Sequence, residues 1–505
     1  MQWRTAVVKN KSIIFADMKI MYCIRGLHNS GGMERVLSVK ANLLASRGHE
    51  VSIVVLRLKG RKPFFPIDPS VNIVDLSAPY LSLPGHPSSA NATSDSPRTT
   101  VSSAVGSAAK PATGSAIRES SAYTVSSAAG NAAGPATGSA RTESSASPVS
   151  SAVGTTSVPA TGSARTESSA SPVSSAAGIA PRPATMASER LKGSVRKRLS
   201  RVVEMLDPDV CVSLCGPEVR ILPAVAGGRP CVAEYHFSHD KFYRKYGGIF
   251  MYPYAWLRTH MLERAVSEYD CMVTLTEHDL PIWKRHCRRV ERIFNPVTTP
   301  PGQVSRLAEK RMIAVGRLED QKNFKDLVSA WSIVAERCPD WRLEIFGEGK
   351  LEHALRSQIA RLGLTGSVIL RGVVKDIASE YSNSSALLMT SLHEGFPLAL
   401  VEASSFGLPL ISYDCPTGPS EIIVDAGDGG FGNVPAATLD QAAGNTPNGY
   451  LVPVGDVRTL ADRICRIASD DNLRLRLGAA SKASSRRFTP ETIISSWEHL
   501  FSSLL

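Results

Sequence analysis

Two cations follow a short apolar run in the second half of the chain. The segment A-V-G-R-L-E-D-Q-K-N places Arg317 and Lys322 five residues apart, directly after a predicted strand. At the carboxyl end of a strand, an Arg fork and a Lys point charge could clamp a diphosphate. The same spacing also suits two solvated surface cations, so both interpretations stay open here.

Two carboxylates flank the start of a predicted helix in H-E-G-F-P-L-A-L-V-E-A, where Glu394 precedes the helix and Glu402 lies inside it. Pro397 suits a first helical turn. Backbone N–H groups around Gly395, Phe396 and Leu398 would then form an anion site. Carboxylates bind hydroxyls strongly, so the pair could hold two sugar rings. The alternative is a dipole-favoured helix-terminal Glu and a solvated Glu.

A histidine is the third chemical candidate. The segment V-A-E-Y-H-F-S-H-D leaves the end of a predicted strand, with Glu234 as a neighbour. His236 is the preferred active-site histidine because it lies closer to the strand end than His239. A purely structural histidine is the competing interpretation.

Strands and helices alternate around these residues. A strand from Met18, a Gly-rich loop, an amphipathic helix and the strand E-V-S-I-V-V-L open a doubly wound parallel sheet. A second series of five apolar strands begins near Arg311, after a Pro- and Gly-rich linker at 295–306. Two such domains would form a cleft lined by the carboxyl ends of their strands.

A tandem repeat interrupts the first domain. V-S-S-A recurs at Val101, Val125, Val149 and Val173, with a period of 24 residues. Each unit offers mainly Ala and single Val side chains, too little apolar surface to offset chain ordering. The repeat is therefore predicted to be a disordered insertion. A glycosylated stalk is the rival interpretation, and the lack of a recognisable signal peptide counts against it.

Taken together, these motifs resemble the retaining nucleotide-sugar glycosyltransferases of family 4, the "group 1" family with the GT-B fold. Glu394 and Glu402 match its E-x7-E motif, and Arg317 and Lys322 match its G-R-x4-K signature. The segments G-G-M-E-R-V-L and N-G-Y-L-V-P-V-G-D match its N-terminal loop and a segment near its end. The resemblance covers about 400 residues.

The resemblance implies a role for each matched residue. Arg317 and Lys322 would bind the donor diphosphate, Glu394 the transferred sugar and Glu402 the ribose. Glycines in the N-terminal loop would let the backbone approach the diphosphate and acceptor. Backbone groups that face the base, and the start of the helix, complete the implied donor site. The implied donor-binding residues are Gly31, Gly32, Arg317, Lys322, Arg371, Gly372, Val373, Glu394, Gly395, Phe396, Pro397, Leu398 and Glu402. The implied catalytic residues are Glu394, His236, Arg317 and Lys322.

The predicted fold is α/β, with two doubly wound Rossmann-like GT-B domains and a disordered insertion in the first. A long loop from Asp428 departs from the family pattern in a segment that comes near the donor in that family. The expected divisions are an N-terminal extension (1–17), the first part of the N-terminal domain (18–83), the repeats (84–186), the second, acceptor-side part (187–300), the C-terminal nucleotide-sugar domain (301–487) and a C-terminal helix that crosses back (488–505).

The charge balance suggests an anionic partner. The chain carries 57 Lys and Arg against 46 Asp and Glu, a net charge of +11. A basic segment at 190–201 and the cation-aromatic segments at 241–246 and 252–258 suit anionic lipid headgroups or a lipid-diphosphate acceptor. A solvated basic face is the alternative, and the absence of a nucleic-acid-binding motif argues against nucleic acid.

The sequence predicts a cytoplasmic glycosyltransferase, peripheral at the inner face of the membrane. It would move a sugar with retention from a nucleotide donor, UDP-linked by expectation, to a glycan or lipid-linked glycan in polysaccharide or glycoconjugate biosynthesis. This is a hexosyltransferase-type activity of the EC 2.4 class. We expect no metal or other cofactor, because cations stand where a metal would act. The alternatives are a GT-B nucleotide-sugar epimerase and a non-catalytic protein presenting the repeat.

Overall fold

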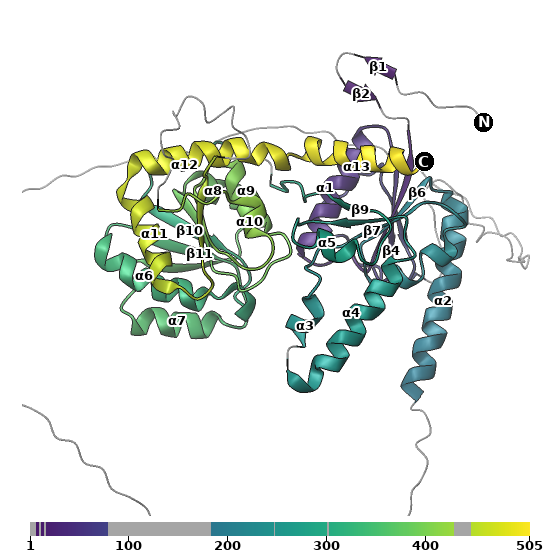
Figure 1. Ribbon diagram of the computed structural model, residues 1–505, viewed down its shortest axis with the longest axis horizontal. Helices are drawn as coiled ribbons and strands as arrows, with labels where there is room; N and C mark the ends of the chain where they lie inside the picture. Colours follow the sequence, from purple (N-terminus) through teal and green to yellow (C-terminus); the bar gives the residue numbers. More distant parts are fainter. Residues whose placement is uncertain are drawn as a thin grey trace, which may run out of the picture. The chain divides into compact units, whose positions relative to one another are not determined.

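The computed structural model describes residues 7–9, 12–14, 17–78, 183–246, 248–299, 302–428 and 446–505. The repeats and most of the loop after Asp428 lie outside these residues, so their predicted character stays a prediction. The described chain resumes at Pro183, which begins helix α2 within the segment assigned to the insertion. The basic segment at 190–201 belongs to this helix (Figure 1).

The first domain is built on a seven-stranded, all-parallel sheet with the order β5-β4-β3-β6-β7-β8-β9. The order reverses between β3 and β6. The chain continues from β3 to β4 on one side of this point and from β6 to β7 on the other. The predicted donor glycines Gly31 and Gly32 follow β3, and the predicted acceptor-side histidine His236 follows β7. The strands are β3 (Lys19–Ile24), β4 (Glu50–Val55), β5 (Asn72–Asp75), β6 (Val210–Ser213), β7 (Cys231–Glu234), β8 (Cys271–Thr274) and β9 (Val290–Arg292).

The second domain has a six-stranded parallel sheet with the order β12-β11-β10-β13-β14-β15. The N-G-Y-L-V segment adds a strand, β15, to the five that the sequence indicates. Its reversal lies between β10 and β13, the strands that precede the two predicted donor motifs. The strands are β10 (Arg311–Val315), β11 (Arg342–Phe346), β12 (Val368–Gly372), β13 (Ala386–Met389), β14 (Leu410–Tyr413) and β15 (Gly449–Val452).

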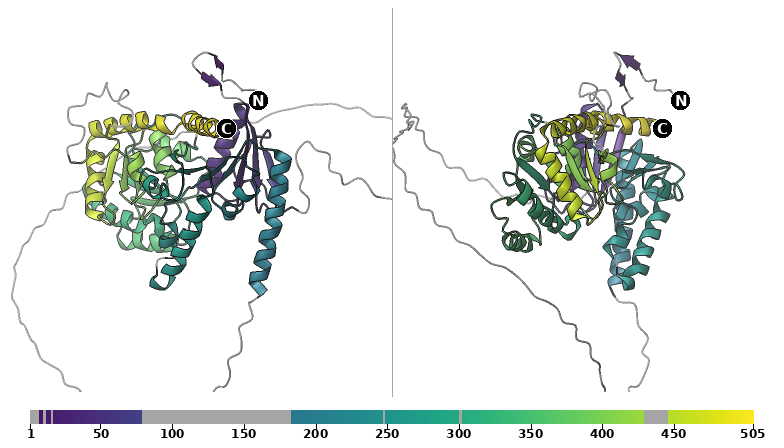
Figure 2. Two further views of the ribbon diagram at one scale, coloured as in Figure 1. Left: turned by 45° about the vertical axis from the view of Figure 1, so that its right-hand side comes forward. Right: turned by 60° about the vertical axis from the view of Figure 1, so that its left-hand side comes forward.

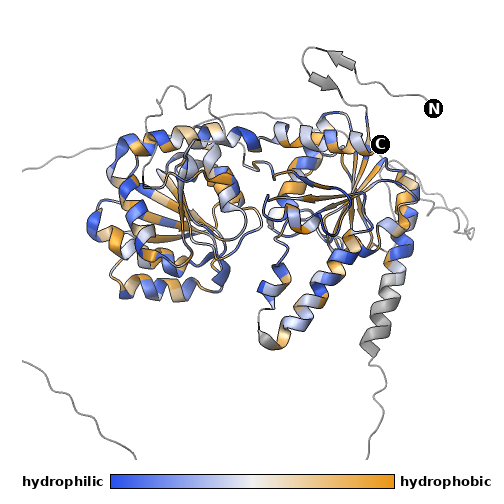
Figure 3. Ribbon diagram, in the orientation of Figure 1, coloured by the Kyte–Doolittle hydropathy of each residue, from blue (hydrophilic) through white to orange (hydrophobic). Residues whose placement is uncertain are grey.

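Helices cover both faces of each sheet, and Figure 3 shows largely apolar strands between helices that carry both polar and apolar residues. Side-chain caps begin several of them, as where Asp456 accepts a hydrogen bond from the backbone N–H of Thr459. The helices are α1 (Gly32–Ser46), α2 (Pro183–Leu206), α3 (Lys241–Lys245), α4 (Tyr252–Val266), α5 (Leu280–Trp283), α6 (Phe324–Arg337), α7 (Glu352–Arg361), α8 (Ile377–Ser382), α9 (Leu398–Ser405), α10 (Pro419–Ile422), α11 (Val457–Ser469), α12 (Asp471–Ser484) and α13 (Pro490–Leu504); short 3₁₀ turns include η3 (Ile249–Met251) and η4 (Asp320–Lys322), and a small hairpin pairs β1 (Val7–Lys9) with β2 (Ser12–Ile14).

The last helix packs on the first domain. Ile493, Trp497 and Phe501 of α13 share one apolar cluster with α1 and with strands β3 and β4. In Figures 1 and 2 the yellow chain end runs from the second domain to the seven-stranded sheet. The chain therefore crosses between the domains twice, once through the linker and once through α13.

Removing the Trp497 side chain should therefore destabilise the protein. Trp497 is 1% exposed, and its ring lies 4.0 Å from the Lys40 ammonium. We expect Trp497→Ala to lower the free energy of unfolding by about 3–5 kcal/mol, the usual cost of a buried Trp truncation. The matched control is Trp256→Ala, at a side chain that is 53% exposed, and it should cost about 0.5 kcal/mol or less. Equal losses in urea titrations would show that α13 does not anchor the first domain.

Candidate active site

Lys322 and Glu394 form an ion pair at the switch point of the second sheet. Lys322 Nζ lies 2.6 Å from Glu394 Oε1, and both side chains are largely buried. The aliphatic part of Lys322 lies against Gly316, where an added Cβ would sit 3.0 Å from Lys322 Cε. Arg317 is placed differently: its side chain is exposed, and Nη1 is 3.2 Å from Glu319 Oε1. The structure thus brings Lys322, but not Arg317, to Glu394.

Strand order explains why these residues meet. β10 and β13 are parallel neighbours, so the loops after them leave the same edge of the sheet. Polar contacts then fix the two loops together. Gln321 Nε2 donates to the carbonyl oxygen of His393 at 2.8 Å, and Thr390 Oγ1 donates to the carbonyl oxygen of Lys322 at 3.0 Å. These hydrogen bonds therefore fix the positions of the two loops that carry Lys322 and Glu394.

Helix α9 begins beside the pair. Leu398 is its first residue, after Pro397 in extended backbone conformation. Phe396 is buried and stacks on Phe294 with ring centroids 5.4 Å apart. Thr417 donates a hydrogen bond to the carbonyl oxygen of Glu394. These contacts hold the predicted anion-binding segment at the N-terminus of the eight-residue helix α9, where the helix dipole favours negative charge.

Two glycines allow the domains to approach each other at this point. A Cβ on Gly395 would clash with the carbonyl oxygen of His236, and a Cβ on Gly32 would lie 3.3 Å from Leu398 Cδ1. Gly31 differs, because the nearest group to an added Cβ is the carboxylate of Glu34 in its own helix. The predicted donor glycines Gly32 and Gly395 are thus close-contact positions between the first and second domains.

Glu402 lies in a buried polar cluster. Its side chain is only 4% exposed, and Oε1 accepts hydrogen bonds from Thr298 Oγ1 at 2.7 Å and Thr299 Oγ1 at 3.0 Å. Arg35 Nη1 lies 2.9 Å from the same oxygen, and Tyr381 donates its hydroxyl to Oε2 at 3.1 Å. The predicted contact with a ribose remains a prediction. The structure adds that Glu402 joins α1, the linker and α8.

The acceptor-side histidine stands next to a second buried ion pair. Lys40 Nζ lies 2.6 Å and 2.5 Å from the two carboxylate oxygens of Glu234, and both side chains are 1% exposed. His236 Nε2 is 3.0 Å from Glu234 Oε1. Burial raises the pKa of Glu234, but the charges of Lys40 and His236 outweigh it and lower that pKa to about 2. Burial also lowers the pKa of Lys40.

The pKa of Glu234 sets a pH range for its contribution to folding. Its ordinary value is 4.5, so the ionised carboxylate stabilises the fold fully above about pH 4.5. That contribution is lost as the pH falls through the native value of about 2.

His239 lies in a different cluster. Its Nε2 is 2.8 Å from Glu263 Oε1, and His286 Nε2 is 3.5 Å from the same atom. Among the described residues this is the group of potential metal ligands, with ligand atoms within 4.8 Å of one another. It belongs to α4 and the loops packed on it, whereas His236 contacts Gly395. The structure therefore separates the two histidines that the sequence left as alternatives. The expectation that the donor site needs no metal stays a prediction.

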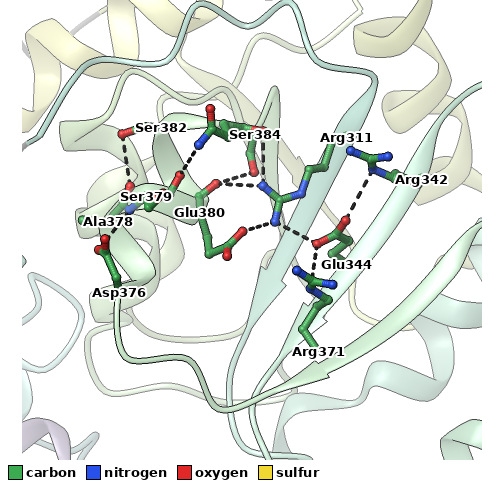
Figure 4. A network of polar contacts seen from close by, with 11 residues as sticks. Arg311, Arg342, Glu344, Arg371, Asp376, Ala378, Ser379, Glu380, Ser382 and Ser384 are labelled. Atoms are coloured by element: carbon green, nitrogen blue, oxygen red, sulfur yellow. Dashed lines mark hydrogen bonds and ion pairs between the residues drawn. The ribbon is translucent and has the colours of Figure 1, made fainter. Parts of the chain in front are cut away.

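Arg371 and Gly372, which are predicted to lie near the base of the nucleotide, are the last two residues of β12, and Val373 follows them. Arg371 points back onto the sheet, where its Nε lies 3.2 Å from Glu344 Oε2, beside Arg311 and Arg342 (Figure 4). Gly372 has a φ of 71°, and Val373 is exposed after it. The Arg371 side chain thus shares Glu344 with Arg311 and Arg342, and contact with a base would fall to the backbone and Val373.

Sequence reasoning missed several polar residues of the site. Arg35 and Lys40 lie in the helix after the Gly-rich loop, and Thr298 and Thr299 lie in the linker. Lys40 is the clearest missed signal, because a lysine on the apolar face of α1 must find a buried anion. Tyr381 gave no comparable signal, since a tyrosine in an amphipathic helix is ordinary.

Comparison with known proteins places these features in context. Residues 300–484 match the family model "Glycosyl transferases group 1". An uncharacterized glycosyltransferase of Haemophilus influenzae is 27% identical over 237 residues, which are 46% of this chain and 62% of that protein. The amylovoran biosynthesis glycosyltransferase AmsD of Erwinia amylovora is 30% identical over 192 residues, which are 38% of this chain and 48% of AmsD. The chain thus spans less than two thirds of either relative.

Two solved structures share the whole fold. Sucrose-phosphate synthase from Thermosynechococcus elongatus aligns with 96% of this chain and 98% of its own, with a TM-score of 0.58 and 14% identity. HepE from Anabaena, solved with UDP and glucose, aligns with 96% of this chain and 100% of its own, with a TM-score of 0.56 and 14% identity. The predicted two-domain α/β architecture is confirmed, and it is the GT-B fold.

Breaking the buried pair on the acceptor side should be costly. Glu234→Gln would leave the Lys40 ammonium without its counter-ion, and we expect a loss of about 3–5 kcal/mol in the free energy of unfolding at pH 7. The control is Glu204→Gln, at an exposed position on α2.

A double variant tests whether the loss comes from the unpaired charge. Glu234→Gln combined with Lys40→Met removes both charges and should recover much of the stability. Additive losses in urea titrations would instead show that the two side chains act separately.

Proposed function

We propose that this chain is a glycosyltransferase that transfers a sugar from a nucleoside diphosphate, with UDP as the expected nucleotide, to a hydroxyl of a glycan or lipid-linked glycan. The observation that carries the proposal is the Lys322–Glu394 pair beside the start of α9, at the switch point of a GT-B domain. The match of residues 300–484 to group 1 glycosyltransferases supports it. The relatives named above suggest polysaccharide biosynthesis.

The proposed chemistry is departure of a nucleoside diphosphate from the anomeric carbon. Negative charge grows on the leaving oxygen, and groups already oriented toward it lower the barrier. Lys322 has three N–H donors, so it can keep one on Glu394 and direct others at phosphate oxygens. The N-terminus of α9 and the exposed Arg317 add positive potential at the same edge of the sheet. These groups are proposed to take the part of a metal ion.

Glu394 and Glu402 have different surroundings, which suit different roles. Glu394 stands at the pair itself, where a carboxylate can bind hydroxyls of the transferred sugar. Glu402 is buried among four protein donors, where a ribose hydroxyl would join an existing cluster. We assign Glu394 to the reacting sugar and Glu402 to the nucleotide. Glu402 would act either by contacting the ribose or by holding the two domains close together.

The acceptor would enter from the first domain. His236 follows β7, and its backbone touches Gly395, so it stands near the proposed sugar position. We propose that His236 contacts the acceptor or the transferred sugar and that Glu234 orients it. Retention of anomeric configuration, a hexose as the transferred sugar, and action at the inner face of the membrane are further parts of this proposal. The relatives do not favour the epimerase alternative, because they are glycosyltransferases.

Substitution of the two glutamates should separate chemistry from binding. Glu394→Gln should lower kcat about 10²–10³-fold, as expected for loss of a transition-state contact. UDP affinity should stay the same or rise, because Lys322 loses a competing carboxylate. Glu402→Gln should weaken UDP binding, with a smaller effect on kcat. Glu336→Gln, at an exposed position of α6, is the matched control and should change neither quantity.

The assay measures UDP release from a panel of UDP-sugars, with calorimetry for UDP affinity. Reactions contain EDTA, since the proposal assigns the leaving-group charge to protein groups; turnover that requires an added divalent ion would contradict that part. Accumulation of an epimerised donor without release of UDP would favour the epimerase. Unchanged rates and affinities in both glutamate variants would remove the support for the enzyme.

A further inference from the structure

An exposed apolar segment spans the 3₁₀ turn η3 and the first turns of α4. Of the fifteen large exposed hydrophobic side chains among the described residues, six lie within the eight residues from Phe250 to Leu257. Phe250 is 97% exposed. Such crowding is unusual for a surface that faces only water, where large exposed hydrophobic residues are scattered singly. We call residues 241–258 the arm.

The arm is also strongly basic. Between Lys241 and Arg258 the sequence has four cations and neither Asp nor Glu. Within the described part of the chain, Lys241, Lys245 and Arg258 form no ion pair. Lys241 and Arg258 lie over aromatic rings instead, 3.0 Å from the Phe237 centroid and 5.1 Å from the Phe242 centroid. Burial, and then the charges of Lys245 and Arg258, lower the pKa of Lys241 to about 8. A nearby anion would relieve this repulsion.

The kinds of residue in the arm match a lipid interface. Trp and Tyr place an apolar ring and a polar edge at the boundary between headgroups and acyl chains. Tyr252, Tyr254 and Trp256 are all exposed, next to Phe250 and Met251. Lysines and arginines beside such rings attract anionic headgroups. No described helix has the length and apolar content needed to cross a membrane.

Ion pairs hold α4 to the first domain, and the helix α2 carries further cations. At the base of the arm, Glu263 of α4 lies 2.8 Å from His239 and 3.5 Å from His286, which ties the helix to two loops of the first domain. In Figures 1 and 2, α2 and α4 extend from the seven-stranded sheet toward the same side. α2 carries the exposed cations Arg196, Lys197 and Arg201. The cations of α2 therefore lie on the same side of the first domain as α4, which carries most of the exposed apolar residues.

We propose that the arm inserts its apolar residues, Phe250 to Leu257, into an anionic phospholipid bilayer, and that the cations of the arm and of α2 bind the headgroups. This inference deepens the part of the proposed function that places the chain at a membrane, and it does not depend on sugar transfer itself. A lipid-linked acceptor would be presented to the same domain that carries His236. Vesicle binding without sugar transfer would refute only the proposed sugar transfer. Sugar transfer without vesicle binding would refute this inference and the proposed action at the membrane, and would leave the proposed reaction standing.

Vesicle sedimentation with the full chain tests the proposal. The wild-type chain should bind vesicles of phosphatidylcholine and phosphatidylglycerol, and bind phosphatidylcholine vesicles much more weakly. The double variant Phe250→Ser, Trp256→Ser should bind the anionic vesicles at least about tenfold less, because it removes two inserted rings. Phe64→Ser is the matched control: Phe64 is 59% exposed but lies outside the arm, so its loss should leave binding unchanged.

Fluorescence adds a measurement of insertion. Trp256 is exposed, whereas Trp283, Trp331, Trp341 and Trp497 are buried. Brominated lipids should therefore quench the wild-type chain and quench Trp256→Ser much less. Failure to bind anionic vesicles, or equal binding by the double variant, would overturn the proposal. So would a change of oligomeric state in the double variant without lipid, because that would assign the arm to a second copy of the chain.

Discussion

The buried carboxylate of Glu402 is the constraint on which the arrangement of the site depends. A charge removed from water must be matched by donors in good geometry, or its burial costs several kcal/mol. Here the donors come from α1, from the linker and from α8: Arg35, Thr298, Thr299 and Tyr381. Since these segments belong to both domains, satisfying one charge also sets how closely the Gly-rich loop approaches the start of α9. Gly32 and Gly395 then provide the space for that approach.

With the domains fixed in this way, local chemistry follows from the strand order. β10 and β13 are neighbours at the reversal of the second sheet, so Lys322 and Glu394 meet although 72 residues separate them. In the first domain, Lys40 of α1 forms a second charged group with Glu234 and His236 at the end of β7. A cation beside a helix N-terminus suits a diphosphate, and a carboxylate beside it suits a sugar. The proposed reaction uses this juxtaposition, and no single residue of the site would suffice.

Much of this could be predicted from the sequence, because the governing signals are local. Apolar runs separated by amphipathic helices predict the parallel sheets, and the spacing in G-R-x4-K and E-x7-E indicates where the proposed chemistry would take place. Contacts between distant segments could not be predicted in the same way. The pairing of Lys322 with Glu394, the exposure of Arg317 and the turn of Arg371 toward Glu344 depend on side-chain directions that spacing does not fix. The sequence prefers His236 to His239 only by its shorter distance from the strand end, whereas the packing of His239 against α4 separates the two clearly.

The central claim is that Lys322 belongs to a nucleoside-diphosphate site. Calorimetry with UDP on Lys322→Ala and on Lys325→Ala tests it most directly, because Lys325 is an exposed lysine only three residues away. Loss of a charge-assisted hydrogen bond costs about 1.5–3 kcal/mol, so Lys322→Ala should weaken UDP binding about tenfold or more, while Lys325→Ala should leave it within about twofold. Equal UDP affinity in the two variants would contradict the account. Lys322 would then have only a structural role, as the ion-pair partner of Glu394.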